Sequence, residues 1–165
     1  LQDIFGKKAK IIRSMPNLLI VENEGVFAYQ LNKYINLDEE AKMAKIFASF
    51  GKNIKLSDEK TFNIITAIAG SGPAYIFFLQ EIFTQILINN QIAQNDASEI
   101  VKQLFFGSAL MSKKSEQNFK ELREAVTSKG GTTEAALEIL QKNNALEKLF
   151  AKAINKAVKR AKELS

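Results

Sequence analysis

The segment from Pro73 to Asn89 reads PAYIFFLQEIFTQILIN, and it decides the fold. Proline is favoured in the first turn of a helix, and the apolar residues that follow cover more than one side of a helical wheel. A helix that is apolar nearly all round must be surrounded by protein. A chain of 165 residues offers few neighbours for such a helix, so we expect a second copy to supply the rest. The alternative is the central helix of a monomeric bundle.

Helical patterns lie on both sides of this segment. Acidic residues at 38–40 favour a helix start, and the apolar stripe that follows ends at Gly51, a residue typical of helix C-termini. Asp58 can cap a helix that runs to Gly70. Further helices are predicted at 96–113, 117–126, 132–142 and 145–163. From residue 38 onward the chain therefore reads as a helical domain.

The beginning of the chain has a different pattern. Residues 1–9 resemble the tail of a helix that closes at Gly6, and short apolar runs at 9–13, 18–21 and 26–29 favour strands, with another near Ile54 and Leu56. The predicted fold class is mainly α, a helical dimerisation bundle preceded by a short α/β segment. We place that segment at residues 1–22 and the helical domain at residues 23–165.

Composition excludes several classes of protein and of chemistry. The chain has 46% apolar and 25% charged residues, 2 Pro, 8 Gly and no Cys, which excludes collagen, low-complexity disorder and disulfide scaffolds. It has no His, so imidazole bases, histidine-ligated metals and Ser-His-Asp triads are excluded. Chemistry must come from hydroxyls, lysines, carboxylates, backbone amides or a cofactor. Absence of Cys and of a signal peptide suggests the cytoplasm, although the absence of thiols fits an oxidising compartment equally well. Ala74–Ile88 is too short and too polar to span a bilayer.

The net charge of +5 is concentrated in the last predicted helix. Its basic residues are Lys148, Lys152, Lys156, Lys159, Arg160 and Lys162. Apolar residues recur at helical spacing on the opposite side, so a solvated helix face is the simplest interpretation. The alternative is a non-enzymatic oligomerisation module that binds nucleic acid through this helix, although no interleaved aromatics or reading motif accompany the charge.

Three stretches are richer in small and hydroxylated residues than a helical bundle requires: Ser14–Asn17, Gly70–Pro73 and Thr127–Thr133. In the third, Gly130 and Gly131 allow unusual backbone conformations and precede a helix whose first amides lack internal partners. Such amides bind anions, so this loop is a candidate site for a carboxylate or phosphate. The alternative is an ordinary connection capped by threonine.

In order and spacing, Ile11–Asn17, Thr66–Tyr75 and Glu124–Thr133 resemble the motifs of pyrroline-5-carboxylate reductase. The resemblance extends from about Lys10 to the end of the chain. It implies hydride transfer from NADPH or NADH to the imine carbon of 1-pyrroline-5-carboxylate, giving L-proline in the last step of proline biosynthesis. It also implies a helical homodimer, with rings of dimers in some relatives, and no nucleic-acid or membrane partner.

The resemblance also implies roles for single residues. The substrate carboxylate would be held by the loop residues Ser128, Gly130, Gly131, Thr132 and Thr133, with Glu116 nearby, and the Thr133 hydroxyl would act near the imine nitrogen. The residues on the cofactor side would be Met15, Pro16, Asn17, Glu59, Thr66 and Ser71. For Glu59, Thr66 and Ser71 the alternative is helix capping, and no metal is implied.

The sequence also departs from the family pattern. Lys129 replaces the usual proline, Leu18-Leu19 replaces Thr-Pro, and Lys60 stands where an acid is common. No Gly-x-Gly-x-x-Gly motif is present, so we expect the cofactor to be bound mainly by an N-terminal Rossmann domain that this chain lacks. The first residue, Leu1, is not methionine, and we expect the chain to be an inactive fragment of the enzyme.

Overall fold

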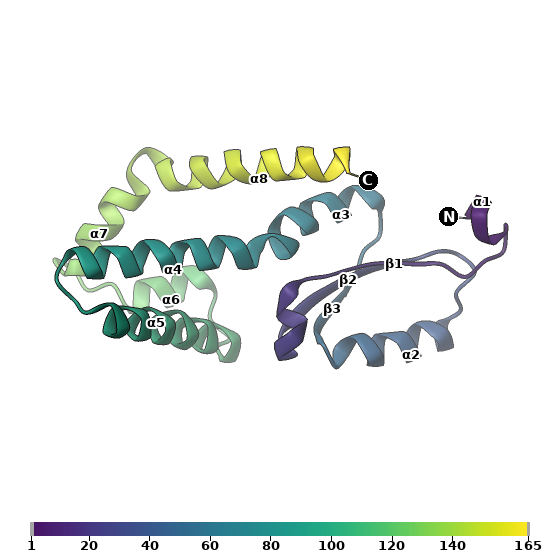
Figure 1. Ribbon diagram of the computed structural model, residues 1–165, viewed down its shortest axis with the longest axis horizontal. Coiled ribbons are helices and arrows are strands. Elements are labelled where there is room, and N and C mark those ends of the chain that lie inside the picture. Colours follow the sequence, from purple (N-terminus) through teal and green to yellow (C-terminus); the bar gives the residue numbers. More distant parts are fainter. Residues whose placement is uncertain (1, 165) are drawn as a thin grey trace. The chain divides into compact units, whose positions relative to one another are not determined.

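The computed structural model describes residues 2–164, and their elements are shown in Figure 1. The chain divides into two compact units, one running to Tyr75 and resuming at Ala153, the other spanning Ile76–Lys152. The elements before the second unit are α1 (Gln2–Phe5), β1 (Ile12–Pro16), the 3-10 helix η1 (Leu18–Glu22), β2 (Gly25–Leu31), α2 (Leu37–Ala48), β3 (Gly51–Lys55), α3 (Glu59–Ile65) and the π-helical turn η2 (Thr66–Gly70). Those that follow are α4 (Gly72–Asn89), α5 (Gln94–Lys114), α6 (Phe119–Ala125), α7 (Thr132–Gln141), the 3-10 turn η3 (Lys142–Asn144) and α8 (Ala145–Glu163).

The first unit is built on a three-stranded sheet in the order β1-β2-β3. β1 and β2 are antiparallel, with Met15 opposite Ala28, whereas β2 and β3 are parallel, with Ala28 opposite Ile54. Parallel strands need a crossover connection, and α2 provides it. The α/β part is therefore a β-α-β unit with one added strand, and it extends well beyond residue 22. The domain division at residues 22 and 23 stays a prediction.

Helices α2 and α3 use opposite faces of β2, because successive strand residues point to opposite sides of a sheet. The ring of Phe27 stacks on Phe47 of α2 with centroids 4.0 Å apart. Between Phe27 and Tyr29, Ala28 is fully buried and clusters with Leu56 and with Phe62 of α3. Met15 packs against the same cluster. This core fixes the end of β1 next to the start of the long helical run.

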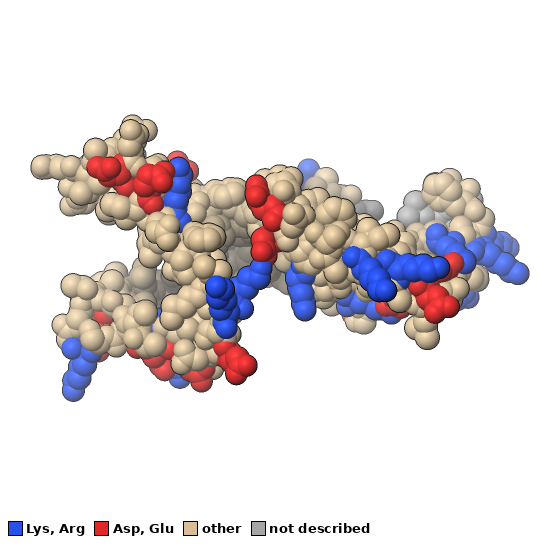
Figure 2. All heavy atoms as spheres, turned by 90° about the horizontal axis from the view of Figure 1, so that it is seen from below, with Lys and Arg blue, Asp and Glu red and all other residues tan. Residues whose placement is uncertain are grey.

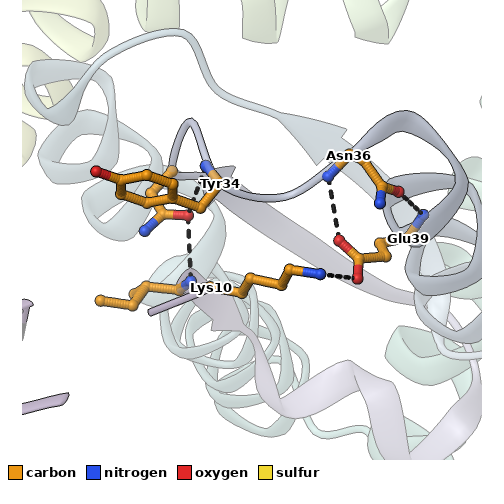
Figure 3. A network of polar contacts seen from close by, with 6 residues as sticks. Lys10, Tyr34, Asn36 and Glu39 are labelled. Atoms are coloured by element: carbon orange, nitrogen blue, oxygen red, sulfur yellow. Dashed lines mark hydrogen bonds and ion pairs between the residues drawn. The ribbon is translucent and has the colours of Figure 1, made fainter. Parts of the chain in front are cut away.

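Helix α2 is held to the rest of its unit by a network of polar contacts at its first turn (Figure 3). The Asn36 side chain accepts from the Glu39 amide and the Glu39 carboxylate accepts from the Asn36 amide, which is a capping box. Lys10, just before β1, pairs with the same carboxylate. The ammonium group of Lys10 and the amide of Asn36 lower the pKa of Glu39, so this carboxylate stays charged and the cap stays intact to a lower pH.

Most of the predicted elements are confirmed. Three predictions were wrong: a strand at residues 18–21, the start of the first strand, and the residue that caps the C-terminus of α2. Residues 18–21 form a 3-10 helix rather than a strand, because the chain must reverse between the antiparallel β1 and β2. The first strand begins at Ile12, not Ala9, and keeps Pro16 as its last residue. Gly51 does not cap α2. Ser49 does, and Gly51 (φ +132°) begins β3, where a side chain would clash with the backbone of Gly25.

The apolar segment at 73–89 is confirmed as helix α4, and Pro73 is its one buried residue. Together α3, η2 and α4 form one helical run, Thr61–Asn89, which by length and composition is able to cross a membrane. Our exclusion of a span on length was therefore wrong, because it counted the apolar residues of one helix and missed its continuation through α3 and η2. Apolar side chains of this run are exposed to solvent, and no other part of the described chain packs over them.

The fold class, mainly α with a short α/β part, is confirmed.

Candidate functional site

The expected cofactor-side residues gather where β1 ends beside the π-helical turn. The Thr66 hydroxyl donates to the Phe62 carbonyl at 2.7 Å and contacts the Met15 sulfur at 2.9 Å. A side chain at Gly70 would lie 3.4 Å from the same sulfur. Strand β1 and η2 are thus in direct contact, although they are about fifty residues apart in the sequence.

Asn17 is the most constrained member of this group, with 7% of its surface exposed. Its side-chain nitrogen donates to the Ala69 carbonyl at 3.0 Å, and its side-chain oxygen accepts from the Val26 amide at 3.1 Å. Its own amide donates to the Val26 carbonyl at 3.2 Å. Asn17 therefore joins the end of β1, the start of β2 and the π-helical turn.

The other residues of the cofactor-side group are held less tightly. Pro16 is exposed at the end of β1, and Ser71 is half-buried, with its amide donating to the Thr66 carbonyl at 3.0 Å. The Thr66 hydroxyl satisfies a carbonyl of its own helix, as the capping interpretation predicted. Glu59 begins α3, but its side chain lies outside the described residues.

The glycine-threonine loop opens helix α7, as the sequence predicted. Gly131 is the N-cap residue, and no side chain caps the helix within the described part of the chain. Gly130 has φ +72°, a conformation that glycine adopts at little cost. The Gly131 amide donates to the Ser128 carbonyl at 3.0 Å, and a side chain at Gly131 would come within 2.5 Å of the Ser128 hydroxyl oxygen. Glycine is thus favoured at both positions, at Gly130 by its positive φ and at Gly131 by the closeness of Ser128.

The first turn of α7 presents its amides in the way an anion site requires. The amides of Thr132 and Thr133 follow an N-cap that has no side chain, so the positive end of the helix dipole is open there. Thr133, the second residue of the helix, is half-buried. This arrangement can hold a small carboxylate and place a hydroxyl beside it.

Two further loop features concern the selectivity of this site. Lys129 is exposed, so a cation stands at the loop where it adds to the attraction of an anion. A pocket of about 220 Å³ lies between α6 and α7, and its lining includes Glu124, Glu134 and Glu138. Arg123 also lines it, so three carboxylates face one guanidinium and the net charge of the lining is negative, which is less favourable for an anion than the open start of α7.

Glu116 is not brought to the loop by any contact that the structure describes. It is exposed in the turn between α5 and α6, where the Gln117 amide donates to the Ser115 hydroxyl at 3.1 Å. Its role in substrate binding stays a prediction. The loop belongs to the second compact unit, and the cofactor-side group belongs to the first.

Sequence reasoning missed one residue, Glu134, and the structural role of another, Asn17. The Glu134 carboxylate accepts from the Gly130 amide at 2.6 Å, and its place three residues after the N-cap was the available signal. The linking contacts of Asn17 had no local signal, because Ala69 lies 52 positions away.

The fold and the loop together define a class of protein: a β-α-β unit followed by helices, with an open helix start suited to a small anion. Residues 59–164 match the family described as pyrroline-5-carboxylate reductase dimerisation. The chain therefore belongs to the pyrroline-5-carboxylate reductase family.

Individual relatives agree with this assignment. Pyrroline-5-carboxylate reductase from Pseudomonas aeruginosa is 32% identical over 160 residues, covering 97% of this chain and 58% of that protein. The protein of the same name from Arabidopsis thaliana is 33% identical over 156 residues, covering 94% and 56%. The chain thus spans somewhat more than half the length of these relatives.

Solved structures show the same similarity. A pyrroline-5-carboxylate reductase from Coxiella burnetii has a TM-score of 0.94 and 36% identity, covering 99% of this chain and 60% of that one. A pyrroline carboxylate reductase from Plasmodium falciparum, solved with NADP bound, has a TM-score of 0.86 and 31% identity, covering 98% and 61%. These relatives support the reductase interpretation and not the nucleic-acid alternative. On the face shown in Figure 2, Asp and Glu lie among Lys and Arg, which is typical of a solvated surface.

Proposed function

We propose that the complete protein carrying this chain is an NAD(P)H-dependent oxidoreductase that reduces 1-pyrroline-5-carboxylate to L-proline. The observation that carries the proposal is the uncapped start of α7 behind Gly130 and Gly131, in a chain that belongs to this reductase family. The known relatives carry the name of this reaction. The product is an amino acid used in biosynthesis, and the cytoplasm is the proposed location.

Substrate binding falls to the loop. The amides of Thr132 and Thr133 would receive the substrate carboxylate, since a helix start offers unpaired N–H groups and a favourable dipole. The Gly131 amide, which the family resemblance also assigned to the substrate, already donates to the Ser128 carbonyl at 3.0 Å. Ser128 supports the loop from beneath Gly131, and Glu116 would lie at its border. Held in this way, the substrate loses its freedom to rotate away from the reacting partner.

The Thr133 hydroxyl would lie near the imine nitrogen and orient the proton that this nitrogen takes up. Its location on the same helical turn as the carboxylate-binding amides suits this role, because carboxylate and imine nitrogen are close together in the small substrate ring. This chain has no His, so an imidazole from these residues is excluded, and the Thr133 hydroxyl is the group that we propose for that step.

The cofactor, when bound, supplies the hydride that reduces the imine carbon. The residues of this chain fit its nicotinamide side only in part. Thr66 contacts Met15 near the end of β1, and we propose that Pro16, Asn17, Ser71 and Glu59 belong to the same side. No phosphate-binding Gly-x-Gly-x-x-Gly motif occurs in the sequence. We propose that a dinucleotide-binding domain outside these residues holds most of the cofactor, so that this chain alone is inactive.

We further propose that the protein is a homodimer, in accordance with the family description. Helix α4 has one buried residue, Pro73, in spite of its apolar sequence. A second copy packed on its exposed faces would remove that apolar surface from water. Assembly of dimers into larger rings is a separate proposal, drawn from the resemblance to the family.

The test is the oxidation of NADPH or NADH by the complete protein in the presence of 1-pyrroline-5-carboxylate, followed by its absorbance. Thr133→Val removes one hydroxyl with little change in volume. We expect kcat/KM for the imine substrate to fall about tenfold, which corresponds to about 1.4 kcal/mol for one lost hydrogen bond, with KM for the cofactor unchanged.

The matched control is Thr84→Val, because the Thr84 hydroxyl donates to a carbonyl of its own helix at 2.8 Å. We expect this variant to keep the kinetics of the wild type. Absence of NAD(P)H oxidation by the wild type would refute the proposed function, and an unaltered Thr133→Val variant would refute the role of Thr133.

A further inference from the structure

Glu134 occupies a special place in the loop that opens α7. It is the third residue of that helix, and its carboxylate reaches back to accept from the Gly130 amide at 2.6 Å. The side chain is half-buried. A hydrogen bond from an amide to a charged carboxylate is stronger than one between neutral groups.

The amide that Glu134 binds is the one on which the shape of the loop depends. Gly130 has φ +72°, and the next residue, Gly131, is extended with φ −85° and ψ 170°. The chain changes direction between them. Fixing the Gly130 amide from one side, while Gly131 donates to the Ser128 carbonyl on the other, holds the turn at both of its glycines.

The contact leaves the first amides of the helix open. The N-cap residue Gly131 has no side chain, and Glu134 bonds the amide before it, so the amides of Thr132 and Thr133 have no side-chain cap. An acid at this position of a helix more often bonds the amide of the N-cap residue itself. In this chain the Glu134 carboxylate instead bonds the amide one residue earlier, that of Gly130. It thus does not occupy the amides that the substrate would use.

We propose that Glu134 is a positioning residue: its carboxylate locks the glycine turn so that the following amides stand ready for the substrate carboxylate. This inference rests on the proposed function. It assigns to Glu134 no contact with the substrate and no part in proton transfer. Two negative charges near one helix start repel each other, and the Gly130 amide together with the helix dipole offsets that repulsion.

Two variants separate the hydrogen bond from the charge. Glu134→Ala removes the acceptor, so we expect KM for 1-pyrroline-5-carboxylate to rise about five- to tenfold in the complete enzyme, with kcat and the cofactor KM within about twofold of the wild type. Glu134→Gln keeps an oxygen at the same reach without the charge, and we expect it to restore KM to within about twofold.

The matched control is Glu138→Ala, one turn later on α7 and in the lining of the same pocket. Glu138 is exposed, and we expect its removal to leave KM unchanged. Thermal unfolding of each variant shows whether it is folded. Slower amide hydrogen exchange at Gly130 in the wild type than in Glu134→Ala would support the contact independently of turnover.

The outcomes are distinguishable. An active wild type whose KM is unchanged or lowered in Glu134→Ala would overturn the positioning role alone. Equal rises in KM in the Gln and Ala variants would also overturn it, because charge and not the hydrogen bond would then be the cause. A wild type that turns over no substrate would overturn the proposed function, and this inference with it.

Discussion

Asn17 is the residue on which the junction between β1 and the long helical run depends. Its buried side-chain oxygen accepts from the Val26 amide at 3.1 Å, and its side-chain nitrogen donates to the Ala69 carbonyl at 3.0 Å. Both ends of the amide are thereby occupied. Its proposed part in cofactor binding must therefore come mainly from the shape it gives to the Met15–Asn17 turn.

Replacing Asn17 by Ala would leave two backbone groups without their partner. We expect the free energy of unfolding of the complete protein to fall by about 2 kcal/mol, the usual cost of unsatisfied groups in a partly buried site. Chemical denaturation measures this. Asn90→Ala is the control, because the Asn90 side chain also donates to a carbonyl, at 2.8 Å, but is exposed. A loss for Asn17→Ala no larger than that of the control would contradict this account.

The roles of some single residues could be predicted from the sequence, and the roles of others could not. The conformations of Gly130 and Gly131 could be predicted, because glycine pairs before a threonine-rich helix start are a local pattern. The linking role of Asn17 could not be predicted, since its partners lie nine and 52 positions away and only the folded chain brings them together.

Helix α4 is the element whose surroundings matter most. It carries apolar residues on all sides, and they are exposed in the described chain. Phe78, with 60% of its surface exposed, is followed one and two turns later by Ile82 and Ile86 on the same side. Phe83 meets Phe105 of α5 edge to face, at 5.7 Å between ring centroids. We propose the side that bears Phe78 as the one on which a second copy packs, because Phe78 has the largest exposed fraction of the large apolar residues of α4.

Phe78→Glu tests that side. A carboxylate in an apolar interface is costly to bury, so we expect the complete protein to shift from dimer to monomer, or to aggregate, in sedimentation at micromolar concentration. Gln117→Glu makes the same change of charge at an exposed position in the turn after α5, and should sediment like the wild type. A Phe78→Glu variant that remains dimeric would exclude this face as the interface.

The helices could be predicted from periodicity and caps, and their ends were found to within a few residues. Asn36, Asp58 and Asn118 each accept from an amide of the helix they begin. The strands were harder to predict, because a run such as Leu18–Val21 is apolar enough for a strand, and the need to reverse the chain makes it a 3-10 helix instead. The π-helical turn at Thr66–Gly70 had no signal, since it depends on contacts with β1.

For the whole molecule, the sequence allowed the family to be predicted because three motifs kept their order and spacing, and the family match confirms it. The place of α2 and β3 could not be predicted: both pack with the sheet, while their sequence resembles the start of a helical domain. Parallel pairing joins residues on either side of a crossover helix, and no local pattern shows such a pairing.

The central claim is that the start of α7 holds the carboxylate of a small amino acid. The most direct measurement is a crystal structure of the complete protein with L-proline. We predict the proline carboxylate within hydrogen-bond distance of the Thr132 and Thr133 amides, with the ring nitrogen near the Thr133 hydroxyl. A structure in which proline binds elsewhere, and in which these amides face solvent, would contradict the account.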